Sequence, residues 1–287
     1  MKLFTASVVD NETIMPATNV LSLRAPEAAR AAAPGQFLHI HCGESTAPLL
    51  RRPMSVYRTE RDVIQLMIRD VGEGSHWLVR RASGDELDCL GPLGHGFRLL
   101  PNARNLLMVG GGYGVAPLVG LAERALKRGA NVVLAVGAAT RTQIFPTDLL
   151  PPEIEYLAAT DDGSAGHHGY VTDLVPERIA WADAVYACGP LAMMETLARI
   201  LREQAPNKPG QIAMEERMGC AMGVCLGCVV ETTRGPLRVC TEGPVFDARQ
   251  ILWRAEARPL ILSVSKESGS TGSPRAELGR TNGHRAG

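Results

Sequence analysis

Aromatic residues are scarce in this sequence of 287 residues, and no segment is hydrophobic enough to span a membrane. Phe, Trp and Tyr make up 5% of the chain, which argues against the stacking surfaces that bind nucleic-acid bases. No uninterrupted apolar run reaches the ~18–20 residues of a transmembrane helix. The formal net charge is zero, so no basic excess attracts nucleic acid or anionic lipid. We expect a protein that binds neither nucleic acid nor membrane.

The N-terminus also lacks the apolar segment of an export signal. Met1 to Phe4 lead directly into polar residues, whereas a secretory signal peptide carries an apolar stretch of about 7–15 residues. A cytoplasmic location is therefore expected, where disulfides are rare. The apolar content of 45% and the charged content of 21% are those of an ordinary globular protein. The length favours one large domain or two to three small ones.

Cysteine is concentrated near the C-terminus. Four of the seven cysteines follow the pattern C-x4-C-x2-C-x11-C, at Cys220, Cys225, Cys228 and Cys240. The first three reproduce the spacing of plant-type [2Fe–2S] proteins, in which a distant cysteine completes the ligand set. Glycines at 219, 223 and 227 interleave with the thiols. Small residues with positive φ would let backbone N–H groups approach the sulfurs, so the segment favours an iron–sulfur cluster and one-electron chemistry.

Two other interpretations of these thiols stay open. Four thiolates also suit a structural zinc ion, although zinc sites usually pair two C-x2-C units and this segment has one. Disulfides are the second alternative and fit poorly with a cytoplasmic chain. Cys42 and Cys89 are interpreted as core thiols, and the isolated residues His39, His41 and His76 as strand or helix residues, not as ligands.

The N-terminal third predicts an all-β barrel or sandwich. Short β-rich segments are separated by Pro, Gly, Asp and Asn, a pattern typical of antiparallel β structure. A further short strand is expected between the turns at Gly84 and Pro92, and a possible helix at His76–Arg81. The expected strands are Leu3–Val9, Asn19–Arg24, Gln36–Cys42, Met54–Arg58 and Val63–Ile68.

From Asn105 the pattern changes to alternating strands and helices, which predicts a parallel α/β sheet. A linker is expected at Pro206–Gly210, before the cysteine segment. The domains predicted are 1–100, 101–210 and 211–254, with a largely disordered tail at 255–287, because the tail carries too little apolar surface. The expected elements are strands Leu106–Val109, Asn131–Val136, Ile154–Ala159 and Trp181–Ala187, and helices Leu118–Arg128 and Leu191–Gln204.

Two turns of the α/β part are candidate nucleotide sites. Gly110, Gly111, Gly112 and Gly114 lie between a buried strand and a helix, where glycines let the backbone approach a pyrophosphate. A tight strand–helix turn without a ligand is the alternative. Cys188-Gly189-Pro190 follows another apolar strand, and strand carboxyl ends are where open α/β sheets bind ligands. A buried core thiol is the simpler interpretation of Cys188.

Two segments of the β part carry weaker signals. Arg51 and Arg52 precede Pro53, Met54 and Ser55; an arginine can hold a phosphate or a flavin edge, and a serine hydroxyl can bond a ring nitrogen. A surface arginine before a strand is the simpler alternative. Residues 72–75, Gly-Glu-Gly-Ser, are a candidate phosphate-binding helix start.

The order of these motifs resembles the ferredoxin–NAD(P) reductase superfamily. Three segments narrow the resemblance: residues 215–220 (Glu-Glu-Arg-Met-Gly-Cys), 225–228 (Cys-Leu-Gly-Cys) and 239–247 (Val-Cys-Thr-Glu-Gly-Pro-Val-Phe-Asp). They resemble the electron-transfer subunit of class B dihydroorotate dehydrogenase. The similarity extends from about residue 5 to Trp253. Tyr113 departs from the family pattern, which commonly has a smaller or differently shaped residue there, and residues 138–141 are a loose version of a family turn.

The resemblance implies a multidomain β plus α/β fold: an antiparallel FAD-binding barrel, a parallel-sheet NAD-binding domain and a small C-terminal [2Fe–2S] lobe. It implies NAD(H) as substrate at the glycine turn and at Cys188, Gly189 and Pro190, and the four cysteines named above as cluster ligands. The implied flavin-binding residues are Arg52, Pro53, Met54, Ser55, Met67, Ile68, Arg69, Gly74 and Ser75.

The function implied is electron transfer between NAD⁺ and a separate FMN-containing catalytic subunit that oxidises dihydroorotate in pyrimidine biosynthesis, within a heterotetramer of two plus two subunits. No residue of this chain is assigned to proton abstraction from dihydroorotate. A similar NAD(P)H-dependent module serving ferredoxin, a sulfide dehydrogenase or a glutamate synthase-like system is the alternative. A zinc-stabilised binding protein without enzymatic activity is the third hypothesis.

Overall fold

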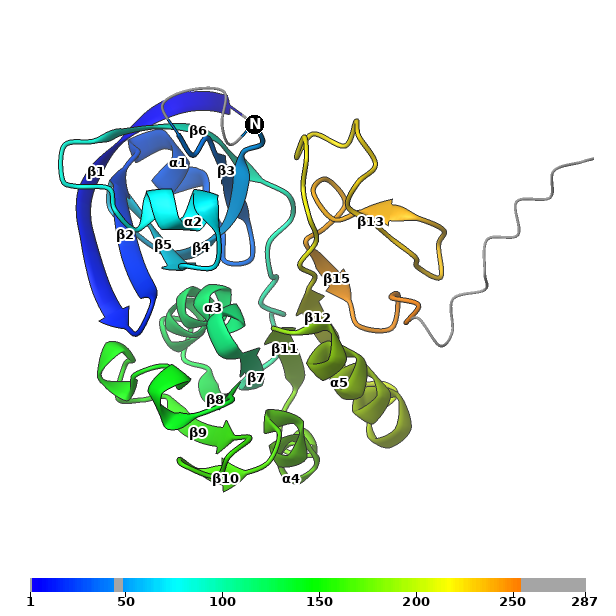
Figure 1. The fold of residues 1–287 in the computed structure, drawn as a ribbon. Helices are drawn as coiled ribbons and strands as arrows, with labels where there is room; N and C mark the ends of the chain where they lie inside the picture. Colours follow the sequence, from blue (N-terminus) through cyan, green and yellow to red (C-terminus); the bar gives the residue numbers. More distant parts are fainter. Residues whose placement is uncertain (1, 44–48, 254–287) are drawn as a thin grey trace, which may run out of the picture. The chain divides into compact units, whose positions relative to one another are not determined.

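The structure is a computed structural model that describes residues 2–43 and 49–253 (Figure 1). These residues belong to one compact unit, Met1–Glu256. The predicted tail at 255–287 lies outside the described residues. Among the helices of the described part, none is long and apolar enough to cross a membrane.

The N-terminal part is a closed antiparallel barrel with the strand order β1-β2-β5-β4-β3-β6, which confirms the predicted barrel. Every strand alternates side chains between the interior and the outside. The interior holds buried residues such as Leu21, Leu38 and Leu66. The strands are β1 (Lys2–Met15), β2 (Thr18–Arg24), β3 (Phe37–Ile40), β4 (Arg52–Glu60), β5 (Val63–Arg69) and β6 (Glu86–Leu93).

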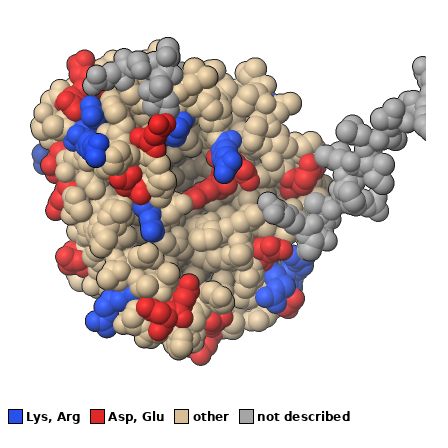
Figure 2. Space-filling view, in the orientation of Figure 1, with Lys and Arg blue, Asp and Glu red and all other residues tan. Residues whose placement is uncertain are grey.

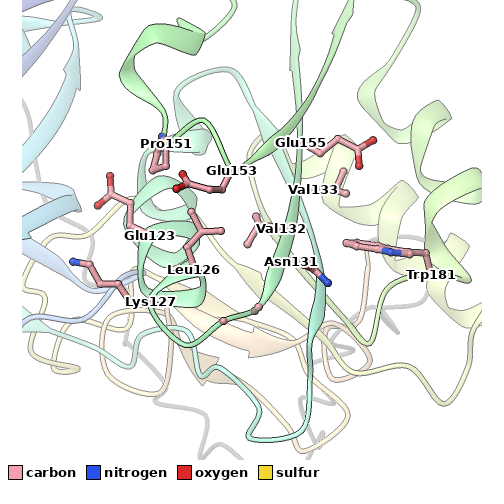
Figure 3. Close-up of a pocket in the computed structure, with 12 residues that line it drawn as sticks. Glu123, Leu126, Lys127, Asn131, Val132, Val133, Pro151, Glu153, Glu155 and Trp181 are labelled. Carbon is pink, nitrogen blue, oxygen red and sulfur yellow. The ribbon is translucent and has the colours of Figure 1, made fainter.

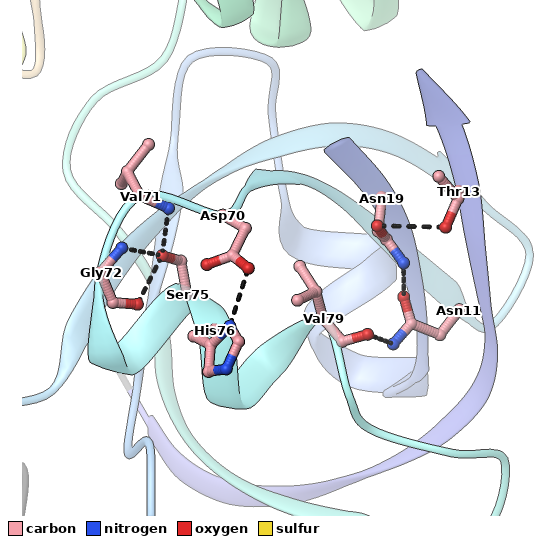
Figure 4. Close-up of polar contacts among 9 residues, drawn as sticks. All are labelled: Asn11, Thr13, Asn19, Asp70, Val71, Gly72, Ser75, His76 and Val79. Carbon is pink, nitrogen blue, oxygen red and sulfur yellow. Dashed lines mark hydrogen bonds and ion pairs between the residues drawn. The ribbon is translucent and has the colours of Figure 1, made fainter. Parts of the chain in front are cut away.

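Two short helices accompany the barrel, α1 (Pro26–Ala31) and α2 (Glu73–Leu78). The predicted start of the second helix at His76 is wrong, since the helix begins three residues earlier. The hydroxyl of Ser75 accepts hydrogen bonds from the backbone N–H groups of Val71 and Gly72 and donates to the Gly72 carbonyl (Figure 4). These bonds close the first turn and fix the helix start at Glu73.

The second half is a 7-stranded sheet with the order β10-β9-β8-β7-β11-β12-β15, in which β15 alone among the described strands of that sheet is antiparallel. This confirms the predicted parallel α/β sheet. The strands are β7 (Asn105–Gly111), β8 (Asn131–Ala138), β9 (Glu155–Thr160), β10 (His167–His168), β11 (Ala184–Cys188), β12 (Gly210–Ala213) and β15 (Val245–Asp247).

Helices cover both faces of this sheet, because alternate residues of its buried strands point to opposite sides. The even-numbered residues of β7 pack in one core with α3, and the odd-numbered ones in another with α4 and α5. The helices are α3 (Ala116–Leu126), α4 (Val175–Ile179) and α5 (Leu191–Gln204), with short 3-10 helices η1 (Gly112–Val115), η2 (Arg141–Gln143), η3 (Thr147–Leu149) and η4 (Val171–Leu174).

The strand order reverses between β7 and β11. The chain runs outward from β7 through β8 and β9 to β10 on one side, and from β11 to β12 on the other. Open parallel sheets bind ligands at the carboxyl ends of the two strands that flank such a reversal. The two turns predicted as nucleotide sites follow β7 and β11, so the fold places both of them at this position.

The cysteine segment is joined to the sheet by its flanking strands. β12 pairs with β11, and β15 returns to pair with β12, so the predicted linker at Pro206–Gly210 ends within a strand. Between them lies the two-stranded sheet of β13 (Val229–Val230) and β14 (Leu237–Arg238). Cys228, Cys240 and Trp253 share a core with residues of α5. The cluster segment is therefore packed on the sheet.

Candidate functional site

A cavity of about 950 Å³ is the main candidate site. Its lining comes from β4, β5, α2, the turn after β7 and the segment after β12. The surface in Figure 2 is hollowed near its centre, with basic and acidic side chains along the edge. All the predicted flavin-binding residues line this one cavity: Arg52, Pro53, Met54, Ser55, Met67, Ile68, Arg69, Gly74 and Ser75. Their contact with a flavin stays a prediction.

Arg52 lies against α2 on the wall of the cavity. A Cβ placed on Gly74 would come within 2.7 Å of Arg52 Cγ and 2.8 Å of its Nε, so the glycine leaves the space that the arginine fills. The Nη1 atom of Arg52 donates a hydrogen bond to the Leu50 carbonyl at 2.6 Å. These contacts fix the Arg52 side chain along the barrel. A guanidinium group fixed in this way is pre-organised to donate hydrogen bonds to a ligand in the cavity.

Ser75 does not offer its hydroxyl to the cavity in this structure. The hydroxyl is engaged with the backbone of Val71 and Gly72, at 2.9 and 3.0 Å from their nitrogens. Nearby, His76 Nδ1 lies 2.8 Å from an Asp70 carboxylate oxygen (Figure 4). Ser75 therefore shapes the loop at residues 71–74, and a phosphate contact through its hydroxyl would require the exchange of one of these bonds.

The two turns predicted to bind the nucleotide, at residues 110–114 and 188–190, are packed directly against each other. A Cβ on Gly111 would lie 2.5 Å from Pro190 Cδ, and one on Gly114 would lie 2.7 Å from the Cys188 carbonyl oxygen. Gly112 has a φ of 54°, in the left-handed region. Gly110 completes the predicted set, with its own Cβ position 3.1 Å from Val115. The glycines thus permit close packing at the reversal point, where Gly189 also lies.

Cys188 is buried beside the cavity and lies next to Glu215, an exposed residue of the cavity lining. Their Sγ and Oε1 atoms are 3.8 Å apart. Burial raises the pKa of the Cys188 thiol well above its usual range, and Glu215 raises it further. Desolvation of its carboxyl group among the neighbouring side chains also raises the pKa of Glu215, although the thiol hydrogen bond opposes this shift. Cys188 is buried, as the core interpretation requires, and it is also in contact with a residue that lines the cavity.

Several residues of the cavity lining lie outside the predicted flavin-binding set. Met214 to Met218 line the cavity from the strand β12 onward, and Tyr113 lines it from the glycine turn. The segment Glu215–Met218 belongs to the family pattern before Cys220, but the resemblance did not assign it to the flavin site. Because the segment ends two residues before Cys220, a predicted cluster ligand, its position along the chain could have indicated a place near the redox groups. Pro244 belongs to the family segment 239–247, but that segment implied no place for it in the flavin site, and no motif signalled Leu50 or Val71.

The cluster thiols lie in a loop that directs backbone N–H groups at sulfur. The Sγ of Cys220 accepts hydrogen bonds from the N–H groups of Met222, Val224 and Cys225, each at 3.4 Å. Burial raises the pKa of Cys220, but these donors outweigh it and bring the pKa to about 6. Since the thiolate is the ligand form, the loop favours metal binding by Cys220.

The thiols are arranged as two pairs. The thiols of Cys220 and Cys225 lie close enough for the second to affect the pKa of the first, and Cys228 affects the pKa of Cys240 in the same way. Burial and Cys228 raise the pKa of Cys240 to about 11. Among the described residues, no group of three or more His, Cys, Asp or Glu side chains is gathered to hold one metal ion. Two pairs fit a cluster of two irons that takes its four protein ligands as thiolates.

Two of the interleaved glycines have a different role from the one expected. Gly223 has a φ of 79°, but Gly219 and Gly227 are not in the left-handed region, which Ala221 and Leu226 occupy instead. Cβ atoms on Gly219 and Gly227 would lie 3.5 and 3.6 Å from Cys225 Sγ. These two glycines keep side chains away from that sulfur and leave space around it.

Arg238 ties the cluster loop to β14. Its Nη1 donates to the Gly223 carbonyl at 3.0 Å, and its Nε donates to Glu242 at 2.9 Å. Hydrogen bonds from Arg238 lower the pKa of Glu242 to about 2. The loop that surrounds Cys220 and Cys225 is therefore anchored to the segment that carries Cys240.

Known proteins identify this combination of a barrel, a nucleotide sheet and a cysteine loop. The family model for the iron–sulfur cluster binding domain of dihydroorotate dehydrogenase B matches residues 215–252, and that for the oxidoreductase NAD-binding domain matches residues 108–199. The dihydroorotate dehydrogenase B (NAD⁺) electron-transfer subunit of Desulforamulus reducens is 38% identical over 261 residues, covering 88% of this chain and 99% of the relative. The chain belongs to this family.

Other members of the electron-transfer subunit family agree with this assignment. The protein of Bacillus caldolyticus is 41% identical over 226 residues, covering 76% of this chain and 86% of the relative. A solved structure described as an NADH-dependent reduced ferredoxin–NADP oxidoreductase is 28% identical, with a TM-score of 0.77 over 88% of this chain and 91% of that chain. Phthalate dioxygenase reductase, 17% identical with a TM-score of 0.60 over 80% of this chain and 87% of that chain, shares the fold.

A second cavity, of about 920 Å³, lies at the edge of the sheet opposite the two predicted nucleotide turns (Figure 3). It is lined by residues at the starts of β8 and β9, including Asn131 and Glu155, and by Trp181. Glu123 and Glu155 in its lining form ion pairs with Arg58 and Arg178. No predicted site residue lines this cavity.

His39 is buried on β3, and neither ring nitrogen makes a hydrogen bond of normal geometry with the described residues. Burial lowers its pKa to about 4, while backbone groups of Met218 and Arg51 oppose the shift. The ordinary histidine pKa in an unfolded chain is about 6.5. Between these two values the unfolded chain binds more protons, so the free energy of unfolding falls as the pH falls through this window.

Replacing His39 with Gln is expected to reduce this loss of stability in acid, because Gln does not titrate. The measurement is the thermal unfolding midpoint at pH 7.5 and pH 5.0. The decrease between the two pH values should be smaller for His39→Gln than for the parent chain. His168→Gln, on an exposed histidine of β10, is the control and should behave as the parent. Equal decreases in the parent and in His39→Gln would mean that His39 is not held neutral by burial.

Proposed function

We propose that this chain is the electron-transfer subunit of an NAD⁺-linked dihydroorotate dehydrogenase in pyrimidine biosynthesis. It passes electrons between a catalytic subunit and NAD⁺ by way of a [2Fe–2S] cluster and FAD. Family membership supports this assignment, and one structural observation carries it. Residues 214–218 line the cavity proposed for the flavin, and Cys220 follows two residues later. A flavin in the cavity and a cluster on the loop would thus share one backbone segment.

The residues present fit these groups. The cavity offers the Arg52 cation, the small residue Gly74 and further residues of two barrel strands, and the two thiol pairs fit two irons. FAD, when bound, supplies the conversion between two-electron hydride transfer with NAD(H) and one-electron transfer with the cluster. The barrel residues would hold the flavin, and the turns after β7 and β11 would hold the dinucleotide. Residues 1–100, 101–210 and 211–254 would be the corresponding domains.

The proposed partner is a catalytic subunit that carries FMN and oxidises dihydroorotate, in a heterotetramer of two plus two subunits in the cytoplasm. The cluster loop supports a partner surface here. Met222, Val224 and Leu226 are 48%, 76% and 62% exposed, and the Cys225 that they flank is exposed too. Apolar side chains exposed around a redox centre suit an interface that brings a second centre within electron-transfer range and excludes water.

The test is copurification of the native complex, followed by an assay of NAD⁺ reduction by dihydroorotate. We expect a flavin-containing partner and activity only with both subunits. The triple variant Met222→Ser, Val224→Ser, Leu226→Ser should release the partner and keep its own iron, sulfide and FAD. Leu3→Ser, on an exposed residue of the barrel, is the matched control. Copurification with a ferredoxin or another acceptor, without dihydroorotate oxidation, would overturn the assignment in favour of a reductase for that partner.

We expect the subunit to prefer NADH to NADPH. Asp161 and Asp162 follow β9, and Asp162 accepts hydrogen bonds from the Ser164 N–H and hydroxyl. Arg141, the candidate cation after β8, donates from Nε to the Ser164 carbonyl at 2.9 Å. A 2′-phosphate needs positive charge, whereas a ribose hydroxyl tolerates or prefers a carboxylate. Two carboxylates beside one engaged arginine therefore favour NADH.

The measurement is steady-state reduction of an artificial acceptor with each dinucleotide. Asp161→Asn should move the ratio of kcat/KM values toward NADPH, and Asp10→Asn in the barrel should leave the ratio unchanged. A kcat/KM for NADPH equal to or above that for NADH in the parent chain would contradict the expected preference for NADH and would favour the alternative reductase function.

A further inference from the structure

Tyr113 brings an aromatic ring from the α/β part onto the wall of the barrel cavity. It lies in η1, directly after β7, lines the cavity and is 44% exposed. The guanidinium carbon of Arg69, on β5, is 5.9 Å from the centroid of the Tyr113 ring. This distance is within the range of a cation–π contact. Arg69 of the barrel therefore contacts the ring of Tyr113, which belongs to the α/β part.

The position of Tyr113 in the topology connects the two sites. The turn after β7 flanks the point where the strand order reverses, at which open sheets bind nucleotides. Three residues bring this turn and the start of α3 to the cavity, namely Tyr113, Ala116 and Pro117. Ala116 and Pro117 are buried, so Tyr113 supplies the exposed side chain. A dinucleotide bound at the reversal point, with its reactive ring directed into the cavity, meets Tyr113.

The environment of Tyr113 favours a role for its ring over one for an ionised hydroxyl. Burial raises the pKa of the phenol, Glu215 raises it further, and Arg69 opposes the shift. The hydroxyl therefore stays protonated at neutral pH and contributes no charge. The planar face remains as the feature that can recognise a ligand, since aromatic rings pack in offset or edge-on arrangements with other conjugated rings.

We propose that Tyr113 is a binding residue for the nicotinamide ring of NAD(H), and that its ring, held by Arg69, contributes to dinucleotide affinity. This inference rests on the proposed function, because it requires both a flavin in the cavity and a dinucleotide at the reversal point. The loss of one aromatic contact should weaken dinucleotide binding about 2- to 13-fold, the range for such pairs. Removal of the hydroxyl alone should change the affinity little.

The experiment compares Tyr113→Phe and Tyr113→Leu in the FAD-loaded full chain. The dissociation constant of NAD⁺, which binds without turnover, is measured by calorimetry, and the KM and kcat for NADH are measured with an artificial acceptor. Tyr113→Leu should raise the Kd for NAD⁺ and the KM for NADH by the same factor at equal FAD content. Tyr113→Phe should stay close to the parent in both constants.

Trp77→Leu is the matched control. It removes another arginine–aromatic contact, in which Arg81 lies 4.1 Å from the ring centroid, and Trp77 is not among the residues that line the cavity. Unchanged NAD⁺ binding by Tyr113→Leu, in a parent that binds NAD⁺, would overturn the role of Tyr113 and leave the proposed function standing. Loss of FAD from Tyr113→Leu would also overturn it, because Tyr113 would then be a flavin residue. A flavin-loaded parent that NADH cannot reduce would refute the proposed function itself.

Discussion

Replacing Cys225 with Ser is expected to abolish the [2Fe–2S] cluster while most of the FAD stays bound. Cys225 is exposed, so a serine in its place disturbs no packing, and the effect of the variant isolates ligation. The thiol lies beside Cys220. Its sulfur also lies next to Gly219 and Gly227, which have no side chains to surround it. Metal binding and folding are coupled in such lobes, so residues 219–241 should also become more sensitive to protease.

The measurement is the iron and sulfide content of the purified variant, together with the EPR signal of its reduced state. The FAD content serves as an internal control, because the proposed flavin residues lie mainly on the barrel. Cys42→Ala is the matched thiol control, since Cys42 is buried in the barrel core, and it should keep the full cluster. Full iron content and an unchanged EPR signal in Cys225→Ser would exclude Cys225 as a ligand.

Replacing Arg52 with Ala is expected to weaken FAD binding strongly. A hydrogen bond to a charged group is worth about 1.5–3 kcal/mol, which is roughly 10- to 150-fold in affinity. Arg52 is half-buried in the cavity wall, packed on Gly74, and Nη1 is already held by the Leu50 carbonyl. The guanidinium group carries five N–H donors, so the same fork can hold an anionic or carbonyl acceptor of the flavin.

The test is the FAD retained after gel filtration and the Kd obtained by adding FAD back. Arg52→Lys should give an intermediate affinity, because lysine keeps the charge but not the fork. Arg24→Ala, at the exposed end of β2, should bind FAD as the parent does. Normal FAD retention by Arg52→Ala would return Arg52 to the simpler interpretation of an arginine that only packs on the barrel surface.

Local patterns in the sequence were sufficient where a short segment makes its own structure. The cysteine spacing predicts the ligand set because a loop of a few residues carries three of the four thiols. The apolar segments Leu106–Val109 and Asn131–Val136 both lie within observed strands, since a strand buried on both faces is continuously apolar. Boundaries were less predictable. The helix α2 begins at Glu73 because Ser75 closes its first turn with its side chain, and hydrophobic periodicity carries no information about such a contact.

The sequence by itself determined the combination of a β barrel with a parallel α/β sheet, and the family, and it predicted the cluster ligands. Each of these depends on residues close together in the chain or on their order along it. Only the tertiary structure brought Arg52, Glu215 and Tyr113, which lie on three separate segments, to one cavity. It alone placed the nucleotide turns at the strand-order reversal between β7 and β11. The physical reason is that strand order and cavity walls arise from pairing and packing between segments that can be more than 160 residues apart, as Arg52 and Glu215 are. No local pattern of hydrophobicity or turn residues encodes such contacts.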